Sequence, residues 1–370
     1  MGVDIQEKLR LALGSVKDHA SIGKAMIYNH HDGFSHIEVA VLRATGHDNG
    51  PIDDEHMHEI LFLVSNSPGS IPFLAERNSR RLCKTRDRLV ALKTLVLIHR
   101  LLRGGNRCFE QELRGAHVSG HLQLCNPWIS KNSFLSKYAA YLEERMGWLI
   151  NQAGKLEPVV MSPGLDFRCY EEKSIDMVFR KLPKCQLLID RVLDCSPTSD
   201  IFPTDYLAQA AMISTLKESF QVYFTFCEGI AALVNMFFDL NRAARGLACE
   251  ILKRASRQTQ DLHDMYEECK RIIENKNLEY PSVQIITMEH VMALEECLGC
   301  PQNQPPPILG CLSNPTKPLR RAKEGKKNEN NIFSCALETK ISMVWVLFEE
   351  DDHLSNSVQH KIGGDVVKIR

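Results

Sequence analysis

The 370-residue sequence has no excess of charge of one sign, because 45 lysines and arginines face 46 aspartates and glutamates, a formal net charge of −1. Without a net charge, the molecule as a whole exerts no long-range attraction on nucleic acids or acidic membranes. Any such attraction must come from a local cluster of basic side chains. We therefore expect no nucleic acid among the partners.

The sequence also lacks an apolar run suited to crossing a bilayer. Its most apolar stretch, residues 220–240, contains Gln221, Glu228 and Asn235, which favours a buried core helix. The first six residues have neither the basic and apolar regions of a signal peptide nor the Ser or Thr of a myristoylation signal. These absences predict a cytoplasmic protein that meets membranes only peripherally.

Motifs of catalytic and metal sites are missing as well. There is no G-x-S-x-G elbow, Walker loop or dinucleotide fingerprint. Thirteen cysteines are scattered, which predicts reduced thiols, and the CxxC of Cys297 and Cys300 has no second ligand pair. We expect no catalytic residues, no cofactor and no metal. The alternative is an enzyme or metal protein built around the histidines that gather in the first 58 residues.

Helical periodicity is what the sequence has in abundance, up to about residue 300. No fixed period repeats, so a consensus repeat array is not supported. Short amphipathic helices joined by tight turns predict an all-α fold, an irregular stack in which each helix buries its stripe against the next. The predicted helices cover residues 5–25, 36–45, 51–64, 71–82, 86–102, 133–147, 174–195, 206–240 and 241–273.

The composition changes near residue 301. Pro301 and the prolines 305–307 stop helical structure, and a basic stretch follows at 317–327. The apolar run 341–348 is too short to form a core of its own. We predict a helical domain over residues 1–300, followed by a linker and a short, poorly ordered tail over 301–370.

Six segments of the helical region resemble plant ANTH-domain clathrin-assembly proteins of the ENTH/ANTH/VHS superfamily. They are Lys17–Gly23, Glu38–His47, His99–Gly105, Tyr138–Arg145, Lys217–Gln221 and Phe237–Leu240, in the family's order. The resemblance implies a right-handed, α-solenoid-like superhelix whose lipid-binding end covers roughly residues 1–110. It also implies docking on phosphoinositide membranes, with recruitment of clathrin and vesicle SNAREs. The expected locations are clathrin-coated pits and vesicles, with the Golgi apparatus as a further one.

The resemblance implies a lipid site of a basic residue, nine intervening positions, then Lys-x-Lys/Arg-His/Tyr. Arg43 and His56 fit this motif, but Asp53 and Glu55 stand where two lysines belong. At about 1 kcal/mol per charge near an acidic surface, these two reversals weaken the site by about 4 kcal/mol. We expect the inherited site to be weak or replaced.

Two other groups of basic residues are candidates for a replacement site, because phosphate recognition needs several converging donors. One group lies on the first helix (Lys8, Arg10, Lys17 and Lys24) and the other at a helix junction (Arg77, Arg80, Arg81, Lys84, Arg86, Arg88 and Lys93). The alternative is a solvated helical face with a few ion pairs. The predicted phosphoinositide-binding residues are Arg43, His56, Lys17 and Lys24.

In the tail, one segment faintly resembles a clathrin box, namely Leu347, Phe348, Glu349, Glu350 and Asp351. The sequence thus predicts a clathrin-coat adaptor that binds a phosphoinositide membrane, clathrin and SNARE cargo at once. The alternative is an ANTH scaffold that has lost lipid binding and acts through protein contacts only. Asp53 and Glu55 favour this alternative.

Overall fold

The computed structural model describes residues 2–28, 34–65, 69–130, 133–150, 156–158, 170–197, 205–273 and 278–299. The chain divides into two compact units, residues 1–308 and 309–370, and every described residue belongs to the first unit.

In the described ranges the chain forms eleven α-helices, two 3-10 turns and one short antiparallel hairpin. The helices are α1 (Gly2–Tyr28), α2 (Ser35–Ala44), α3 (Asp54–Ser65), α4 (Ser70–Lys84), α5 (Arg88–Gly104), α6 (Arg107–Val118), α7 (Phe134–Arg145), α8 (Tyr170–Asp194), α9 (Tyr206–Asn235), α10 (Arg242–Ile272) and α11 (Met288–Glu296). The hairpin pairs β1 (Trp148–Ile150) with β2 (Leu156–Pro158), Leu149 opposite Glu157.

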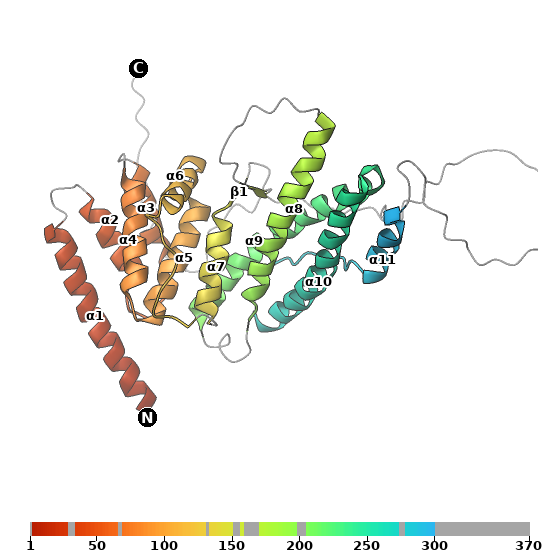
Figure 1. Ribbon diagram of the computed structural model, residues 1–370. Coiled ribbons are helices and arrows are strands. Elements are labelled where there is room, and N and C mark those ends of the chain that lie inside the picture. The colour runs from red at the N-terminus through yellow and green to blue at the C-terminus, as the bar shows by residue number, and fades with distance from the viewer. Residues whose placement is uncertain are drawn as a thin grey trace, which may run out of the picture. The chain divides into compact units, whose positions relative to one another are not determined.

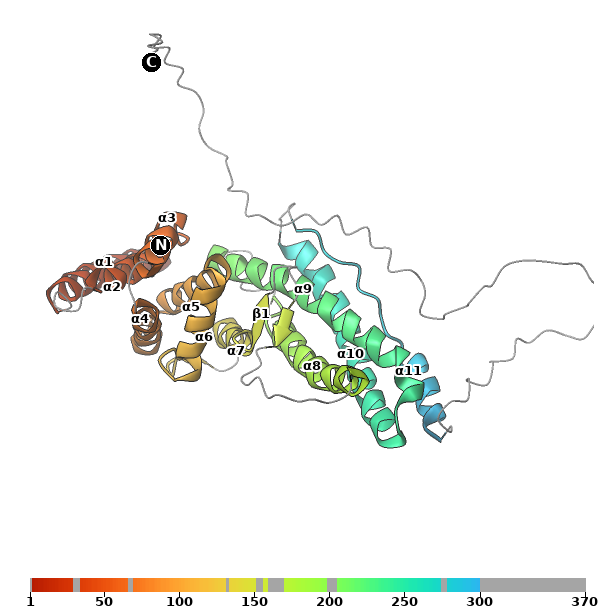
Figure 2. The same ribbon diagram turned by 90° about the horizontal axis from the view of Figure 1, so that it is seen from above.

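The helices follow one another in a row, from α1, α2 and α3 at one end to α10 and α11 at the other (Figures 1 and 2). Each packs mainly on neighbours in this row: α2 contacts α1, α3 and α4, while α8 contacts α7, α9 and α10. The all-α prediction is confirmed, with the hairpin as its exception. No described helix has the length and apolarity that a bilayer span requires, α9 included.

Several helices begin at a residue whose side chain accepts hydrogen bonds from the first free backbone amides of the helix. Asp87 accepts from the amides of Leu89 (2.8 Å) and Val90 (3.4 Å) at the start of α5. Asn106 caps α6 by accepting from the amide of Phe109 at 2.9 Å. Such caps each stabilise a helix by about 1 kcal/mol. Helix α6 is not among the helices predicted from periodicity, although Asn106 is a strong capping residue.

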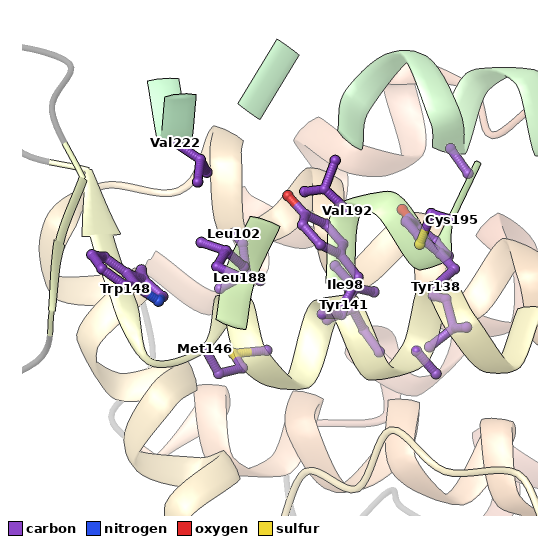
Figure 3. Packing of buried hydrophobic residues seen from close by; sticks show 14 of the residues in the cluster. Ile98, Leu102, Tyr138, Tyr141, Met146, Trp148, Leu188, Val192, Cys195 and Val222 are labelled. Carbon is purple, nitrogen blue, oxygen red and sulfur yellow. The ribbon is translucent and has the colours of Figure 1, made fainter. Parts of the chain in front are cut away.

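The core of the unit is a continuous apolar cluster that runs through the middle helices. Figure 3 shows one part of it, where side chains of α5, α7, α8 and α9 meet around Tyr138 and Tyr141. Among the aromatic residues of the stretch 220–240, which was predicted to form a core helix, Tyr223 and Phe237 are buried, and Phe220 and Phe238 pack against the cluster. Phe224 is the exception, with 36% of its surface exposed.

The first helix differs from the others in the direction of its apolar side chains. Its helical periodicity was predicted, yet Ile5 (68%), Leu9 (58%), Leu13 (53%) and Val16 (67%) are exposed. The helix packs through its opposite face, where Gly14 is required because a Cβ there would collide with His47. The N-terminal half of α1 extends beyond the ends of its neighbours (Figure 1). We call the four exposed side chains the α1 stripe.

A buried ionic network ties α5, α7 and α9 together. Glu218 is fully buried and accepts from Tyr141 Oη at 2.5 Å and from Arg145 Nε at 2.9 Å. His99 Nε2 lies 3.2 Å from the same carboxylate. Burial alone would raise the pKa of Glu218, but the charges of Arg145 and His99 outweigh it and hold that pKa well below its ordinary value.

We predict that Glu218→Gln lowers the free energy of unfolding by about 3 to 5 kcal/mol, because it removes the nearer carboxylate of the buried Arg145 guanidinium and leaves it, among the described residues, only Glu110 at 3.6 Å. Urea unfolding followed by circular dichroism measures this. Glu143→Gln, an exposed carboxylate on α7, is the matched control and should change stability by less than about 0.5 kcal/mol. A loss below about 1 kcal/mol for Glu218→Gln would show that the network is not structural.

Candidate functional site

A groove of about 950 Å³ lies at the first end of the row, between α1 on one side and α2 and α4 on the other. It reaches the turn between α4 and α5. Apolar side chains such as Leu13, Val41 and Leu42 form part of its lining. We call it the basic groove, because basic side chains outnumber acidic ones in its lining.

Basic side chains dominate the lining, with eight against two acidic ones. The basic ones are Arg10, Lys17 and Lys24 of α1, Arg77, Arg80, Arg81 and Lys84 of α4, and Arg86 of the following turn. The acidic ones are Glu38 and Asp87. Two groups of cations separated by about fifty residues in the sequence therefore converge on one surface, with a net charge of +6.

The carboxylate of Asp18 holds the two walls of the groove together. It accepts from the backbone amide (2.8 Å) and Nδ1 (2.8 Å) of His47, and from Arg81 Nη2 at 3.1 Å. Arg81 also donates to the carbonyl of Thr45 at 2.8 Å. Burial alone would raise the pKa of Asp18, but the hydrogen bonds from His47 and Arg81 lower it on balance.

Further ion pairs fix the two ends of the groove. Arg10 Nη1 lies 3.1 Å from Asp87, the residue that also caps α5. Arg77 Nη1 lies 3.3 Å from Glu38 of α2. These cations are thus positioned by carboxylates on neighbouring elements.

Three cations of the groove have no ion-pair partner within the described part of the chain: Lys17, Lys84 and Arg86. All three are exposed. Unpaired ammonium and guanidinium groups on a shared wall favour binding of a multiply charged anion, whose oxygens would replace water at several donors at once.

The structure separates the four predicted lipid-binding residues into two places. Lys17 and Lys24 line the basic groove. Arg43 and His56 lie outside its lining and share one carboxylate, with Glu59 at 3.6 Å from Arg43 Nη1 and 3.8 Å from His56 Nδ1.

The acidic positions of the family motif, Asp53 and Glu55, are exposed beside this pair. The surface around Arg43 is therefore partly neutralised by its own neighbours. In the basic groove four cations are paired as well, Arg80 with Glu76 at 2.7 Å among them, but basic side chains still exceed acidic ones there.

Two of the basic residues predicted to cluster at the helix junction, Arg88 and Lys93, do not line the basic groove. Lys93 is only 1% exposed and pairs with Asp48 at 2.8 Å, so it belongs to the interior. Arg88 pairs with Asp205 at 3.5 Å and lines a smaller adjoining cavity of about 400 Å³. A run of charges on a helix includes residues on every side, and only packing decides which of them reach the surface.

The other candidates from the sequence are the clathrin-box-like segment and the cysteines and histidines considered as metal ligands. The clathrin-box-like segment 347–351 and Cys300 lie outside the described residues. Within those residues, no three His, Cys, Asp or Glu side chains converge as metal ligands would. Sequence reasoning missed Asp18 and His47 as the residues that hold the groove, although both lie in segments that carry the family resemblance.

Fold and site together define an all-helical stack with a basic groove at its N-terminal end. Residues 36–299 match the model of the ANTH domain, and the chain belongs to the ANTH domain family. A "putative clathrin assembly protein" of Arabidopsis thaliana is 54% identical over 95% of this chain and 96% of its own length.

More distant relatives are longer than this chain. The Arabidopsis thaliana clathrin coat assembly protein AP180 is 31% identical over 79% of this chain and 50% of its own length. A second "putative clathrin assembly protein" of that species is 31% identical, over 78% and 52%. The chain thus spans about half the length of these two relatives.

We predict that Asp18→Asn loosens the attachment of α1 to α2 and α4, because it removes a charged acceptor that contributes about 2 kcal/mol. Amide hydrogen exchange in α1 should accelerate by about tenfold or more. Glu55→Gln, an exposed carboxylate on α3, serves as control and should leave α1 exchange unchanged. Because the pKa of Asp18 is lowered, the wild-type contact should persist above pH 3.8 and weaken only in stronger acid. Unchanged exchange in Asp18→Asn would contradict this assignment.

Proposed function

We propose that this protein is a clathrin-coat adaptor without catalytic activity, which docks on phosphoinositide membranes through the basic groove. The observation that carries the lipid part is the convergence of eight basic side chains, three of them without an ion-pair partner among the described residues. A phosphoinositide headgroup presents several phosphates on a small ring, which matches donors arriving from two opposite walls.

Charge magnitude supports this choice of site over the inherited motif. Near an acidic membrane each basic residue contributes about 1 kcal/mol. Asp18 and Glu76, which pair with Arg81 and Arg80, reduce the +6 of the lining to +4, and this charge is still worth several kcal/mol before desolvation is counted. Around Arg43 the exposed acids Asp53, Asp54 and Glu55 oppose any such gain. The groove is therefore the favoured entry for phosphate groups.

The α1 stripe favours a membrane-bound lipid over a free inositol phosphate. Leu13 belongs to both the stripe and the groove lining, so apolar and basic surfaces are continuous on α1. A helix with an apolar face flanked by cations lies in the headgroup region with its apolar face toward the acyl chains. The groove could then bind a headgroup while the α1 stripe is buried in the membrane, with the protein in a single orientation.

Clathrin recruitment is proposed from the relatives, several of which carry clathrin assembly in their names. On this chain the segment for it is 347–351, apolar residues followed by acidic ones. Membrane and clathrin contacts of modest strength would add through effective concentration, so the protein would stay on a membrane where both are present. Coated pits and vesicles are the corresponding location, and Golgi membranes a further one.

Vesicle SNAREs are proposed as a further class of partner. At the far end of the row, α11 exposes Met288 (42%) and Met292 (56%), one helical turn apart, and Leu247 of α10 is 61% exposed. Apolar side chains on adjoining helices are the chemistry that recognises an amphipathic helix.

The rival function is a scaffold that acts through protein contacts without lipid binding. The pairing of Arg43 and His56 with the same Glu59 favours it, since it disables the inherited motif. The rival requires that the basic groove have no affinity for phosphoinositides.

We predict that Lys17→Glu and Lys84→Glu each weaken binding to phosphoinositide vesicles by about thirtyfold, because each reversal changes the groove charge by two units at about 1 kcal/mol per unit. Vesicle co-sedimentation measures this. Lys184→Glu, the same charge change at an exposed position of α8, is the matched control and should stay within about twofold of wild type.

Arg43→Glu separates this proposal from its rivals, because it should weaken vesicle binding much less than Lys17→Glu does. If Arg43→Glu is the more damaging change, the inherited motif is the lipid site. If wild-type protein binds phosphoinositide vesicles no better than neutral ones, the scaffold function stands instead.

We predict that alanine replacement of Leu347 and Phe348 lowers clathrin retention by about tenfold, because apolar anchors dominate short-motif recognition. Pull-down of purified clathrin by the full chain measures retention. Replacing Leu354, a nearby apolar residue outside the motif, is the control. Equal retention by both variants would remove segment 347–351 from the proposal.

A further inference from the structure

A tryptophan stands exposed at the edge of the basic groove. Trp128 is 57% exposed, whereas Trp148 of the hairpin is buried. Trp128 lies in the segment 119–130, which leads from α6 toward α7 and which we call the strap. The proposed function gives this residue no role.

The strap is fixed along α4, the helix that forms one wall of the groove. Its Gln123 amide donates to Ser79 Oγ at 3.1 Å. Further along, Asn126 Nδ2 donates to the carbonyls of Leu82 (2.7 Å) and Thr85 (3.1 Å) at the end of α4.

The polar contacts of the strap are joined by apolar ones, because Leu122 and Leu124 are buried in the core beneath it. A segment held at this many points keeps a defined conformation, so the exposed indole has a fixed place beside the groove.

The indole ring is also joined directly to the groove. The guanidinium carbon of Arg86 lies 4.3 Å from the ring centroid of Trp128, a cation–π contact. Arg86 lines both the basic groove and the smaller cavity next to it. Stacking orients this cation without neutralising it, so Arg86 keeps its full charge for an anion.

The residues of the strap are suited to contact with an acidic membrane, whose headgroups are charged and whose acyl chains are apolar. Between residues 119 and 130 there is no aspartate or glutamate, so an acidic membrane meets no repulsion there. Tryptophan has a large apolar ring and one N–H donor, and it prefers the boundary between headgroups and acyl chains.

We propose that Trp128 is an interfacial membrane anchor, whose indole enters the headgroup–acyl boundary when the basic groove holds a phosphoinositide. This inference rests on the proposed function of the groove and adds a second, apolar contact to it. Arg86 links the lipid headgroup to the anchor, because its guanidinium stacks on the indole ring of Trp128 and its charge is available to the phosphates in the groove. A protein partner that buries Trp128 is the other occupant that the experiment must distinguish.

Tryptophan fluorescence with brominated lipids tests the anchor directly, because bromine quenches only indoles that enter the acyl region. The full chain carrying Trp345→Phe retains Trp128 and the buried Trp148 as its fluorophores. We expect phosphoinositide vesicles with brominated acyl chains to quench its emission. The quenching should disappear in the variant that also carries Trp128→Phe, and neutral brominated vesicles should cause none.

Affinity gives the second readout. Trp128→Ala should weaken binding to phosphoinositide vesicles by about tenfold. Its affinity for a soluble inositol polyphosphate should stay unchanged, which shows that the groove is intact. Unfolding midpoints confirm that the variants fold.

The outcomes separate the two proposals. Wild-type vesicle binding without quenching, or with Trp128→Ala unaffected, would overturn the anchor and leave the lipid-binding groove in place, with a protein partner as the occupant of Trp128. An equal loss of soluble-ligand affinity would reduce Trp128 to a residue that positions Arg86. Absence of wild-type vesicle binding would overturn both proposals.

Discussion

The carboxylate of Asp18 connects three segments that are distant in sequence: the first helix, the loop after α2 through His47, and α4 through Arg81. This contact supports the basic groove together with apolar packing, because the first helix carries its apolar stripe on the outside and packs on α2 through Ile22 and Ala25 instead. A helix attached in this way can present cations and apolar side chains to an external surface together. The proposed membrane contact depends on that arrangement.

The rest of the unit provides a firm support for this end. The apolar cluster and the Glu218 network join α5, α7 and α9, so the middle of the row is stabilised both by packing and by buried charge pairs. Such pairs fix geometry more than they add stability, because desolvation offsets much of their attraction. The two surfaces proposed for binding, the groove near α1 and the exposed methionines of α11, are thus held on one scaffold.

Much of the fold could be predicted from periodicity, because helices such as α4 and α10 bury residues of one face at a spacing of three to four. The site could be predicted only in part. Lys17 and Lys24 were identified by charge. That they line one groove together with Lys84 and Arg86 depends on long-range packing, which the local sequence pattern does not encode. Likewise, Ile5 and Leu9 have the spacing of core residues, and only packing shows that they face outward. The loss of Lys93 to the interior has the same cause.

The most direct measurement of the central claim is hydrogen exchange of the full chain with and without a soluble short-chain phosphoinositide. The groove account predicts slower exchange in residues 10–24 and 77–88, with little change around Arg43 and His56. Protection centred on residues 43–59, with none in the groove walls, would contradict it.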